Sequence, residues 1–93
     1  MKYRSRSEIV GMILNSVMSG ATKSKIMYKA YLSYNQLMEY LPYMTGNELI
    51  SCDELTHLYK ITEKGIKYLR AYAEIDEMIL PNSRYQSLVN TIS

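Results

Sequence analysis

The segment 23–41, KSKIMYKAYLSYNQLMEYL, limits the folds open to this chain more than any other segment does. A short helical pattern over residues 22–29 is followed, after three residues, by a second pattern that begins at Ser33. Ser33 and Gln36 have the spacing of a capping box, in which two side chains satisfy free amides of the first helical turn. The segment therefore predicts two helices, over residues 22–29 and 33–46, joined by a tight turn.

Charged and amide side chains occupy these two helices in an order typical of a helix-turn-helix. The first helix carries Lys23, Lys25 and Lys29, whose ammonium groups suit phosphates, although a solvated face is the commoner role of such lysines. The second helix opens with Asn35 and Gln36, and an amide side chain pairs bidentately with adenine in the major groove. Alternatively, these amides only assist the cap or bind phosphates without reading sequence. The arrangement favours a recognition helix beside cations that contact phosphates.

The second helix also carries a buried stripe and a proline that conflicts with it. Its apolar side chains recur with 3-4-3 spacing and are predicted to face inward: Tyr34, Leu37, Leu41 and Met44. Pro42 lacks a backbone N–H and biases the residue before it away from helical angles. We therefore expect a kink or an early end near Leu41.

The rest of the chain predicts one helix before this pair, and a hairpin and a long helix after it. A capping box at residues 5–8 begins a helix over about 5–19. Two short strands, at 49–52 and 58–61, flank a polar loop and indicate a hairpin.

Thr62 caps the last helix, which reaches about Leu80 before Pro81. The chain is therefore divided into a core over 1–61 with its wing hairpin at 49–61, a helix over 62–80 and a tail over 81–93. The tail has one more capping-box spacing and forms a short helix if something covers its apolar face.

Three helices, a hairpin and a fourth helix, in this order, predict a winged helix-turn-helix, an α+β and mostly α fold. The chain resembles the small archaeal winged-helix DNA-binding proteins typified by the ten-kilodalton Sulfolobus chromatin protein. The resemblance runs from about Arg4 to Met78 and rests on RSRSEIVGMIL, GATKSKIMYKAYLSYNQLMEYL and YKITEKGIKYL. It implies sequence-tolerant binding of double-stranded DNA by a homodimer joined through an antiparallel coiled coil of its C-terminal helices. The chain departs from the family at Glu48, where a glycine usually precedes the first wing strand.

We therefore expect a double-stranded DNA-binding protein, either a transcription regulator or a chromatin-type architectural protein, with helix 33–44 in the major groove. The predicted DNA-binding side chains are Lys23, Lys25, Lys29, Ser33, Tyr34, Asn35, Gln36, Glu39, His57, Lys60, Arg4 and Arg6. Glu39 repels phosphate unless it accepts from a cytosine amino group, so it limits how deep the helix lies.

The wing and the N-terminus are weaker candidates for DNA contact. The acidic wing tip opposes phosphate, which leaves His57 and Lys60 as its candidate contacts, and an ordinary surface histidine is the commoner role of His57. Arg4 and Arg6 either reach DNA as an arm or form a solvated terminus.

The last helix carries two apolar stripes. Ile66, Leu69 and Ala73 suit packing on the chain's own helices. The second stripe has the 4-3-4 spacing of a heptad seam and is the predicted dimer interface: Tyr68, Tyr72, Ile75 and Ile79. The alternative is that the C-terminal tail folds back over this stripe. Pro81 shortens any coiled coil.

Composition bounds the remaining possibilities. A single cysteine, Cys52, excludes an intramolecular disulfide framework, and we expect it to be buried rather than paired with a second subunit. No run approaches ~18 apolar residues and no secretory signal is evident, which predicts a cytoplasmic, nucleoid-associated protein without a membrane partner.

The charge is polarised along the chain. Residues 1–29 have a net charge of +5 and residues 30–93 of −3, which favours one face built for an anion. No nucleophile–base motif, glycine-rich phosphate loop or metal-ligand cluster occurs, so we expect no enzyme, no cofactor, no metal and no small-molecule ligand. The competing hypothesis is a winged-helix module that binds protein without DNA, which the acidic wing and low net charge allow.

Overall fold

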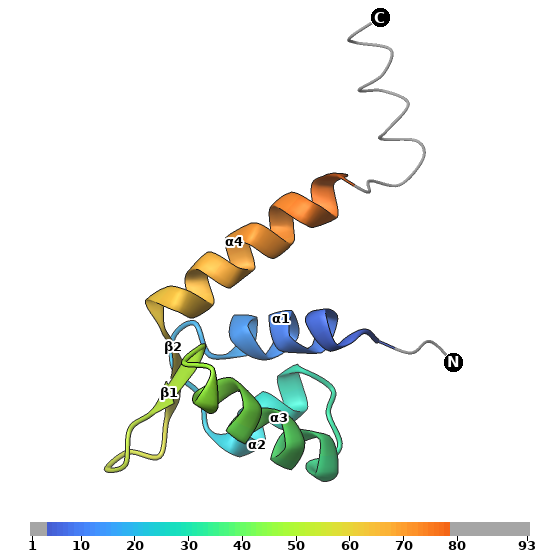
Figure 1. The fold of residues 1–93 in the computed structure, drawn as a ribbon. Helices are drawn as coiled ribbons and strands as arrows, with labels where there is room; N and C mark the ends of the chain where they lie inside the picture. Colours follow the sequence, from blue (N-terminus) through green and yellow to red (C-terminus); the bar gives the residue numbers. More distant parts are fainter. Residues whose placement is uncertain (1–3, 79–93) are drawn as a thin grey trace, which may run out of the picture.

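The computed structural model describes residues 4–78. Its elements follow the order α1 (Arg6–Ser16), α2 (Lys23–Lys29), α3 (Tyr34–Gly46), β1 (Ile50–Cys52), β2 (Tyr59–Ile61) and α4 (Glu63–Met78). In Figure 1, α1 lies between α4 on one side and the α2–α3 pair on the other, with the hairpin at one end. This is the element order of the predicted winged helix-turn-helix. The predicted interface residue Ile79 and the tail 81–93 lie outside the described residues.

Each helix begins where the sequence supplies a capping hydroxyl. Ser5 Oγ accepts from the Glu8 N–H at 3.1 Å, and Glu8 Oε1 accepts from the Ser5 N–H at 3.0 Å, which completes a capping box. Ser33 forms a second capping box at α3, and Thr22 accepts from a backbone N–H at the start of α2. The first three predicted helix starts therefore agree with the structure. The end of α1 does not, because α1 stops at Ser16 and the chain turns there.

The core lies between α1, α2, α3 and the base of the hairpin. The largest fully buried side chains come from all four, and they are Ile13, Leu14, Val17, Ile26, Leu37, Met44 and Ile50. Each contributes roughly 1.5–3 kcal/mol by leaving water. This burial fixes α3 against α2 and so sets the angle at which the first turn of α3 leaves the domain.

The predicted early end of α3 near Leu41 is wrong, because the helix continues through Pro42 to Gly46. Leu41 and Met44, on either side of the proline, are both buried, whereas Pro42 itself is exposed. Losing one helical hydrogen bond on the solvent side costs less than exposing these two side chains, so tertiary burial overrides the local preference.

Tyr34 does not belong to the buried stripe of α3, contrary to the sequence prediction. Its side chain is 63% exposed, whereas Tyr40, absent from the predicted stripe, is buried beside Leu41. Tyr34 is the first residue of α3, and the neighbouring Ser33 and Asn35 are exposed as well. The first turn of the helix therefore projects beyond the core.

The ends of α2 and α3 share one geometry, in which a non-glycine residue takes a left-handed backbone. Tyr31 has φ 54° and Glu48 has φ 60°. After α2, the N–H of Leu32 donates to the Met27 carbonyl at 3.0 Å. After α3, the N–H of Leu49 donates to the Met44 carbonyl at 2.9 Å. These are Schellman motifs, whose left-handed position glycine usually fills. Glu48 therefore adopts a conformation that glycine adopts more readily.

The hairpin is antiparallel, with Ile50 opposite Ile61 and Cys52 opposite Tyr59. Tyr59 also forms an isolated bridge with Ala21, and their two backbone N–H···O bonds measure 2.8 and 2.9 Å. The segment between α1 and α2 thus holds one edge of the wing. The predicted strands, 49–52 and 58–61, begin one residue before the observed ones.

Helix α4 approaches the base of the wing closely at Gly65. A Cβ at this position would overlap the Leu49 carbonyl oxygen and come within 2.7 Å of Ile61 Cγ1. The Thr62 hydroxyl caps the helix by accepting from the Gly65 N–H at 3.0 Å, as predicted, and it donates to the Leu49 carbonyl at 3.0 Å. Among residues 4–78, no helix is long and apolar enough to cross a membrane.

We predict that Gly65→Ala lowers the free energy of unfolding by about 3 kcal/mol, because backbone and core atoms must move to admit the methyl group. Urea denaturation at one fixed protein concentration measures the change. Gly46→Ala is the matched control, since its Cβ would meet no atom within 4 Å. The control should be stabilised by about 0.5–1 kcal/mol, as expected for an unhindered helical glycine. Equal stabilities of the two variants would contradict the close approach.

Candidate nucleic-acid interface

The three lysines of α2 divide between two directions. Lys25 and Lys29 are four residues apart on the helix, and both are exposed, whereas Ile26 is buried. Lys23 instead lies toward the wing, where it lines a hollow together with His57. Within residues 4–78 the one ion pair joins Arg6 and Glu39, so none of the three ammonium groups is neutralised by an acidic partner there. They form a basic surface that is available to an anion.

The two amide side chains at the tip of α3 differ in their contacts, since one is bound in the helix cap and the other is not. Gln36 Oε1 accepts from the Ser33 N–H at 3.0 Å, so this amide takes part in the cap, which was one of the two predicted alternatives. Asn35 is exposed, and its side-chain amide takes no part in the cap of α3. Asn35 is therefore the amide better placed for a base edge, because Gln36 Oε1 is already engaged in the cap.

Glu39, one turn further along α3, faces Arg6 of α1. Arg6 Nη2 lies 3.5 Å from Glu39 Oε2, and the Arg6 guanidinium carbon lies 5.3 Å from the ring centre of Tyr40 and 4.8 Å from that of Tyr43. An exposed pair of this kind adds at most about 1 kcal/mol of stability. The pair matters more for the charge of the exposed face of α3, because the Arg6 cation offsets the negative charge of Glu39 there.

Arg4 is neither a free arm nor a solvated terminus, the two roles that the sequence suggested. Its Nη1 donates to the Ala30 carbonyl at 2.6 Å and its Nη2 to the Tyr31 carbonyl at 2.7 Å. Nη1 also lies 3.2 Å from Met12 Sδ. The guanidinium therefore satisfies carbonyls at the C-terminal end of α2, where a cation is also favoured by the helix dipole. These contacts hold the turn that precedes the recognition helix.

The wing tip is an acidic turn organised by Asp53. Its carboxylate accepts from the N–H groups of Leu55, at 2.8 Å, and Thr56, at 3.3 Å. These bonds, with a smaller contribution from His57, hold the pKa of the Asp53 carboxyl below its ordinary value. The aspartate therefore stays charged at neutral pH, which makes the tip of the wing unattractive to phosphate.

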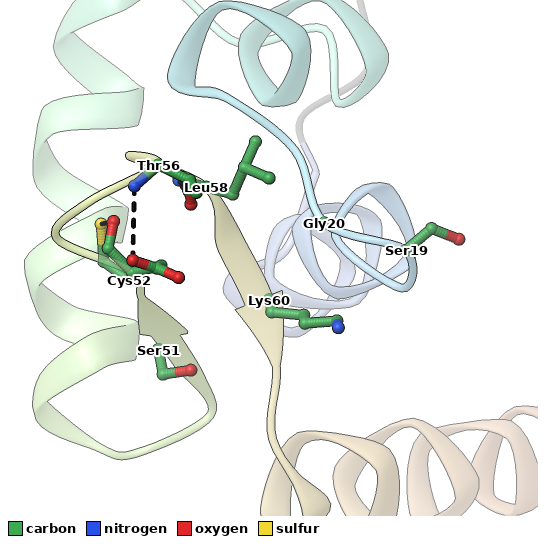
Figure 2. Close-up of a pocket in the computed structure, with 8 residues that line it drawn as sticks. Ser19, Gly20, Ser51, Cys52, Thr56, Leu58 and Lys60 are labelled. Atoms are coloured by element: carbon green, nitrogen blue, oxygen red, sulfur yellow. Dashed lines mark hydrogen bonds between the residues drawn. The ribbon is translucent and has the colours of Figure 1, made fainter.

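The two predicted wing contacts lie on opposite faces of the hairpin. Figure 2 shows Lys60 pointing toward the turn of Ser19 and Gly20 at the end of α1, with which it lines an open hollow. His57, which has a left-handed φ of 59°, lies on the other side with Lys23. The structure thus brings His57 to the basic surface of α2 and leaves Lys60 away from it.

Cys52 is exposed, so the expectation that it is buried is wrong. It stands at the end of β1 opposite Tyr59 and lines the hollows on both faces of the wing. Partial burial, and then the neighbouring Cys52, raise the pKa of the Tyr59 hydroxyl. A three-residue strand at the tip of the domain leaves too little structure above Cys52 to cover it. Among the described side chains, residues 4–75, 77 and 78, no three His, Cys, Asp or Glu gather as a metal site would require.

The predicted dimer seam is partly occupied within the chain itself. Tyr68 packs against the core and its hydroxyl lies 3.5 Å from the Ser7 carbonyl. Tyr72 stacks on Tyr68 with ring centres 6.3 Å apart, and it borders Gly11 of α1. Ile75 is 58% exposed. The tyrosine half of the stripe therefore serves the packing of α4 on α1.

Sequence reasoning missed two exposed aromatic side chains beside the basic surface, Tyr28 and Tyr31. A signal for them was present in KSKIMYKAYLSY, where Tyr28 falls between Lys25 and Lys29 and Tyr31 follows two residues later. Aromatic side chains interleaved with cations are typical of surfaces that bind nucleic acids.

Comparisons with known proteins agree with this geometry. The family model described as a winged helix-turn-helix matches residues 3–80. Among solved structures, Sso10a-2, a DNA-binding protein from Sulfolobus solfataricus, is similar with a TM-score of 0.67 and 21% identity, over 97% of this chain and 98% of that chain. This likeness shows the shared fold and, with the family match, confirms the resemblance found in the sequence. No curated protein matches.

A second group of similar structures comes from Lactococcus lactis ZitR. The wild-type protein has a TM-score of 0.61 and 27% identity, over 100% of this chain and 63% of that chain. Its complex with DNA has a TM-score of 0.61 and 26% identity, over 100% and 64%. The chain therefore spans less than two thirds of ZitR.

We predict that Arg4→Lys lowers the free energy of unfolding by about 1–2 kcal/mol, because a single ammonium group does not reproduce the two-pronged contact with both carbonyls. Thermal or urea denaturation measures the loss. Arg6→Lys is the matched control, since its ion pair is exposed, and its stability should change by less than about 0.5 kcal/mol. If both variants are equally stable, Arg4 does not hold the turn.

Proposed function

This chain belongs to the winged helix-turn-helix family, and we propose that it binds double-stranded DNA. The observation that carries the proposal is the set of exposed lysines on α2, unpaired within the described residues, beside the exposed first turn of α3. Cations flanking a projecting helix tip suit a duplex, whose phosphates border the groove that the helix enters. The proposal is one of binding, and we assign no catalysis to the chain.

In this proposal the first turn of α3 enters the major groove. Ser33, Tyr34 and Asn35 are all exposed there, and Lys23 and Lys25 lie at the start of α2, in reach of the flanking phosphates. His57 adds a contact on the wing side of the same surface. Sso10a-2, which shares the fold, is named as a DNA-binding protein, and ZitR of the same fold has been solved with DNA.

The interface favours phosphate contacts over base reading. Gln36 is committed in part to the cap and Glu39 to Arg6, so Asn35 is the one amide of the tip left open. A single bidentate amide discriminates between bases by about 1–3 kcal/mol, which gives modest specificity. We therefore propose sequence-tolerant binding, as in a chromatin-type architectural protein, ahead of an operator-specific regulator. Such a protein acts in the cytoplasm, on the nucleoid.

We further propose that the protein binds as a homodimer through the far half of α4. Ala71, Ile75 and Met78 are spaced four and three residues apart and are exposed, Ile75 by 58% and Met78 by 77%. Because Tyr68 and Tyr72 pack on α1, the strip that remains for a partner differs from the predicted seam. Burying this strip against a second copy removes apolar surface from water.

One observation favours a different function, a module that binds another protein. Leu55, at the acidic tip of the wing, is 93% exposed. Leu55 directly follows Asp53 and Glu54. An apolar side chain next to carboxylates suits a protein surface better than a phosphate backbone. The two functions differ in their dependence on salt, because nonspecific binding to DNA is essentially electrostatic.

We predict that the chain binds a random-sequence duplex at ~50 mM salt and that its log–log salt slope becomes shallower by about 0.9 in Lys25→Ala, which removes one phosphate contact. Fluorescence anisotropy with a labelled duplex measures both quantities. Lys64→Ala, the same change on α4, is the matched control and should keep the wild-type slope. Absence of measurable binding at ~50 mM salt would favour the protein module.

The same titration separates tolerant binding from base reading. Asn35→Ala should leave the salt slope unchanged and weaken binding to all duplexes alike if the protein is architectural. A loss confined to one or two base positions would instead identify a sequence-specific regulator.

Sedimentation tests the dimer. At tens of micromolar the wild-type chain should sediment as a dimer, and Ile75→Glu should shift it toward monomer, because a charge then has to be buried at the interface. Leu55→Glu, which places the same charge at the wing tip, should remain dimeric. A wild-type chain that is monomeric at this concentration would rule out the proposed dimer.

A further inference from the structure

Two tyrosine rings at the C-terminal end of α2 lie almost entirely in water. Tyr28 is 82% exposed and Tyr31 is 77% exposed. The aromatic ring pairs found among residues 4–78 join Tyr40 to Tyr43 and Tyr68 to Tyr72, so neither exposed ring stacks on another there. Large uncovered rings only three residues apart in the sequence mark a surface where something else binds.

The backbone conformation at Tyr31 indicates that folding does not require a tyrosine there. Its φ of 54° is a conformation that glycine adopts readily and a side-chain-bearing residue adopts at a cost. The bond from the Leu32 N–H to Met27 and the Arg4 contact to the Tyr31 carbonyl hold it there. The backbone of the turn is therefore fixed in place, so presenting the ring costs little further backbone entropy on binding.

Cations lie beside the two rings. Tyr28 is three residues after Lys25 on the exposed side of α2, with Lys29 next to it, and neither lysine has an acidic partner within residues 4–78. This end of α2 leads into the turn before α3, on the opposite side of α1 from α4 (Figure 1). The surface therefore combines aromatic faces with positive charge.

We propose that Tyr28, Tyr31, Lys25 and Lys29 form a second nucleic-acid surface, which binds unpaired bases of single-stranded DNA or RNA. The rings stack on the faces of successive bases, and the lysines contact the phosphates between them. Stacking of this kind is tolerant of sequence, because every base has a π-face.

A duplex gives these rings no comparable partner. Its base faces are closed by their own stacking, so only backbone and groove edges are left for an outside side chain. The proposal thus goes beyond duplex binding by the tip of α3. The two surfaces share Lys25, and the rings of Tyr28 and Tyr31 distinguish the second from the first. The proposal also accounts for a tyrosine at the left-handed position, where a glycine would serve the fold better.

Anisotropy with labelled oligo(dT) and oligo(U), each of about 15 nucleotides, tests the proposal at ~50 mM salt beside a random-sequence duplex. Tyr28→Ala and Tyr31→Gly should each weaken single-strand binding at least about fivefold and change duplex binding less than about twofold. Tyr31→Gly should also unfold at higher urea concentration than wild type, because glycine relieves the left-handed strain. Weaker binding by a more stable protein cannot be attributed to misfolding.

Tyr28→Phe and Tyr31→Phe are the matched controls, and they should keep single-strand affinity within about twofold, because stacking needs the ring and not the hydroxyl. Preference between oligo(dT) and oligo(U) identifies DNA or RNA as the better ligand, and either supports the proposal. Wild-type protein that binds duplex but neither single strand would overturn it and leave duplex binding intact. Equal losses in the Phe and the Ala or Gly variants would also overturn it. Binding to single strands without duplex binding would instead refute the proposed function alone.

Discussion

Two helix ends set the directions of α3 and of the wing hairpin, the elements next to the proposed duplex interface. At these ends Tyr31 and Glu48 take a left-handed backbone. A left-handed backbone at a residue with a side chain costs about 1 kcal/mol of stability relative to glycine. At each end the Schellman hydrogen bonds, and the burial of the leucine that comes next in the chain, offset this cost. Leu32 and Leu49 are both 7% exposed. The end of α2 sets the direction of the recognition helix, and the end of α3 sets the direction of the wing. Because the two leucines are packed in the core, the core fixes the position of the surface that meets a ligand.

Charge is used inside this domain as well as on its surface. Arg4 satisfies carbonyls at the end of α2, and Arg6 offsets Glu39 of α3. Both arginines belong to the basic first third of the chain, so part of the charge polarity seen in the sequence stabilises the fold and does not await an anion. Among the described residues of this third, 4–29, the cations that remain for phosphates are the lysines of α2. The interface is therefore smaller, and more dependent on a few side chains, than the net charge of residues 1–29 suggests.

Helix starts could be predicted from the sequence because a cap is a local device. Ser5, Thr22, Ser33 and Thr62 each accept from a backbone N–H within the next three residues, and their spacing alone indicates this. Helix ends and inward faces were less predictable, because they depend on what packs against the helix. Pro42 lies within α3 since Leu41 and Met44 are buried on either side of it, and Tyr34 is exposed since the first turn projects past the core.

The same distinction applies to the candidate site. The sequence by itself determined the winged helix-turn-helix order, the lysines of α2 and the amide tip of α3, because residue type and spacing along the chain carry that information. Only the tertiary structure decided that Arg4 holds a turn, that Lys60 faces away from His57, and that Tyr68 and Tyr72 pack on α1. A side chain's partners across the fold depend on distances between segments, and those distances are set when the core closes around Ile13, Ile26 and Met44.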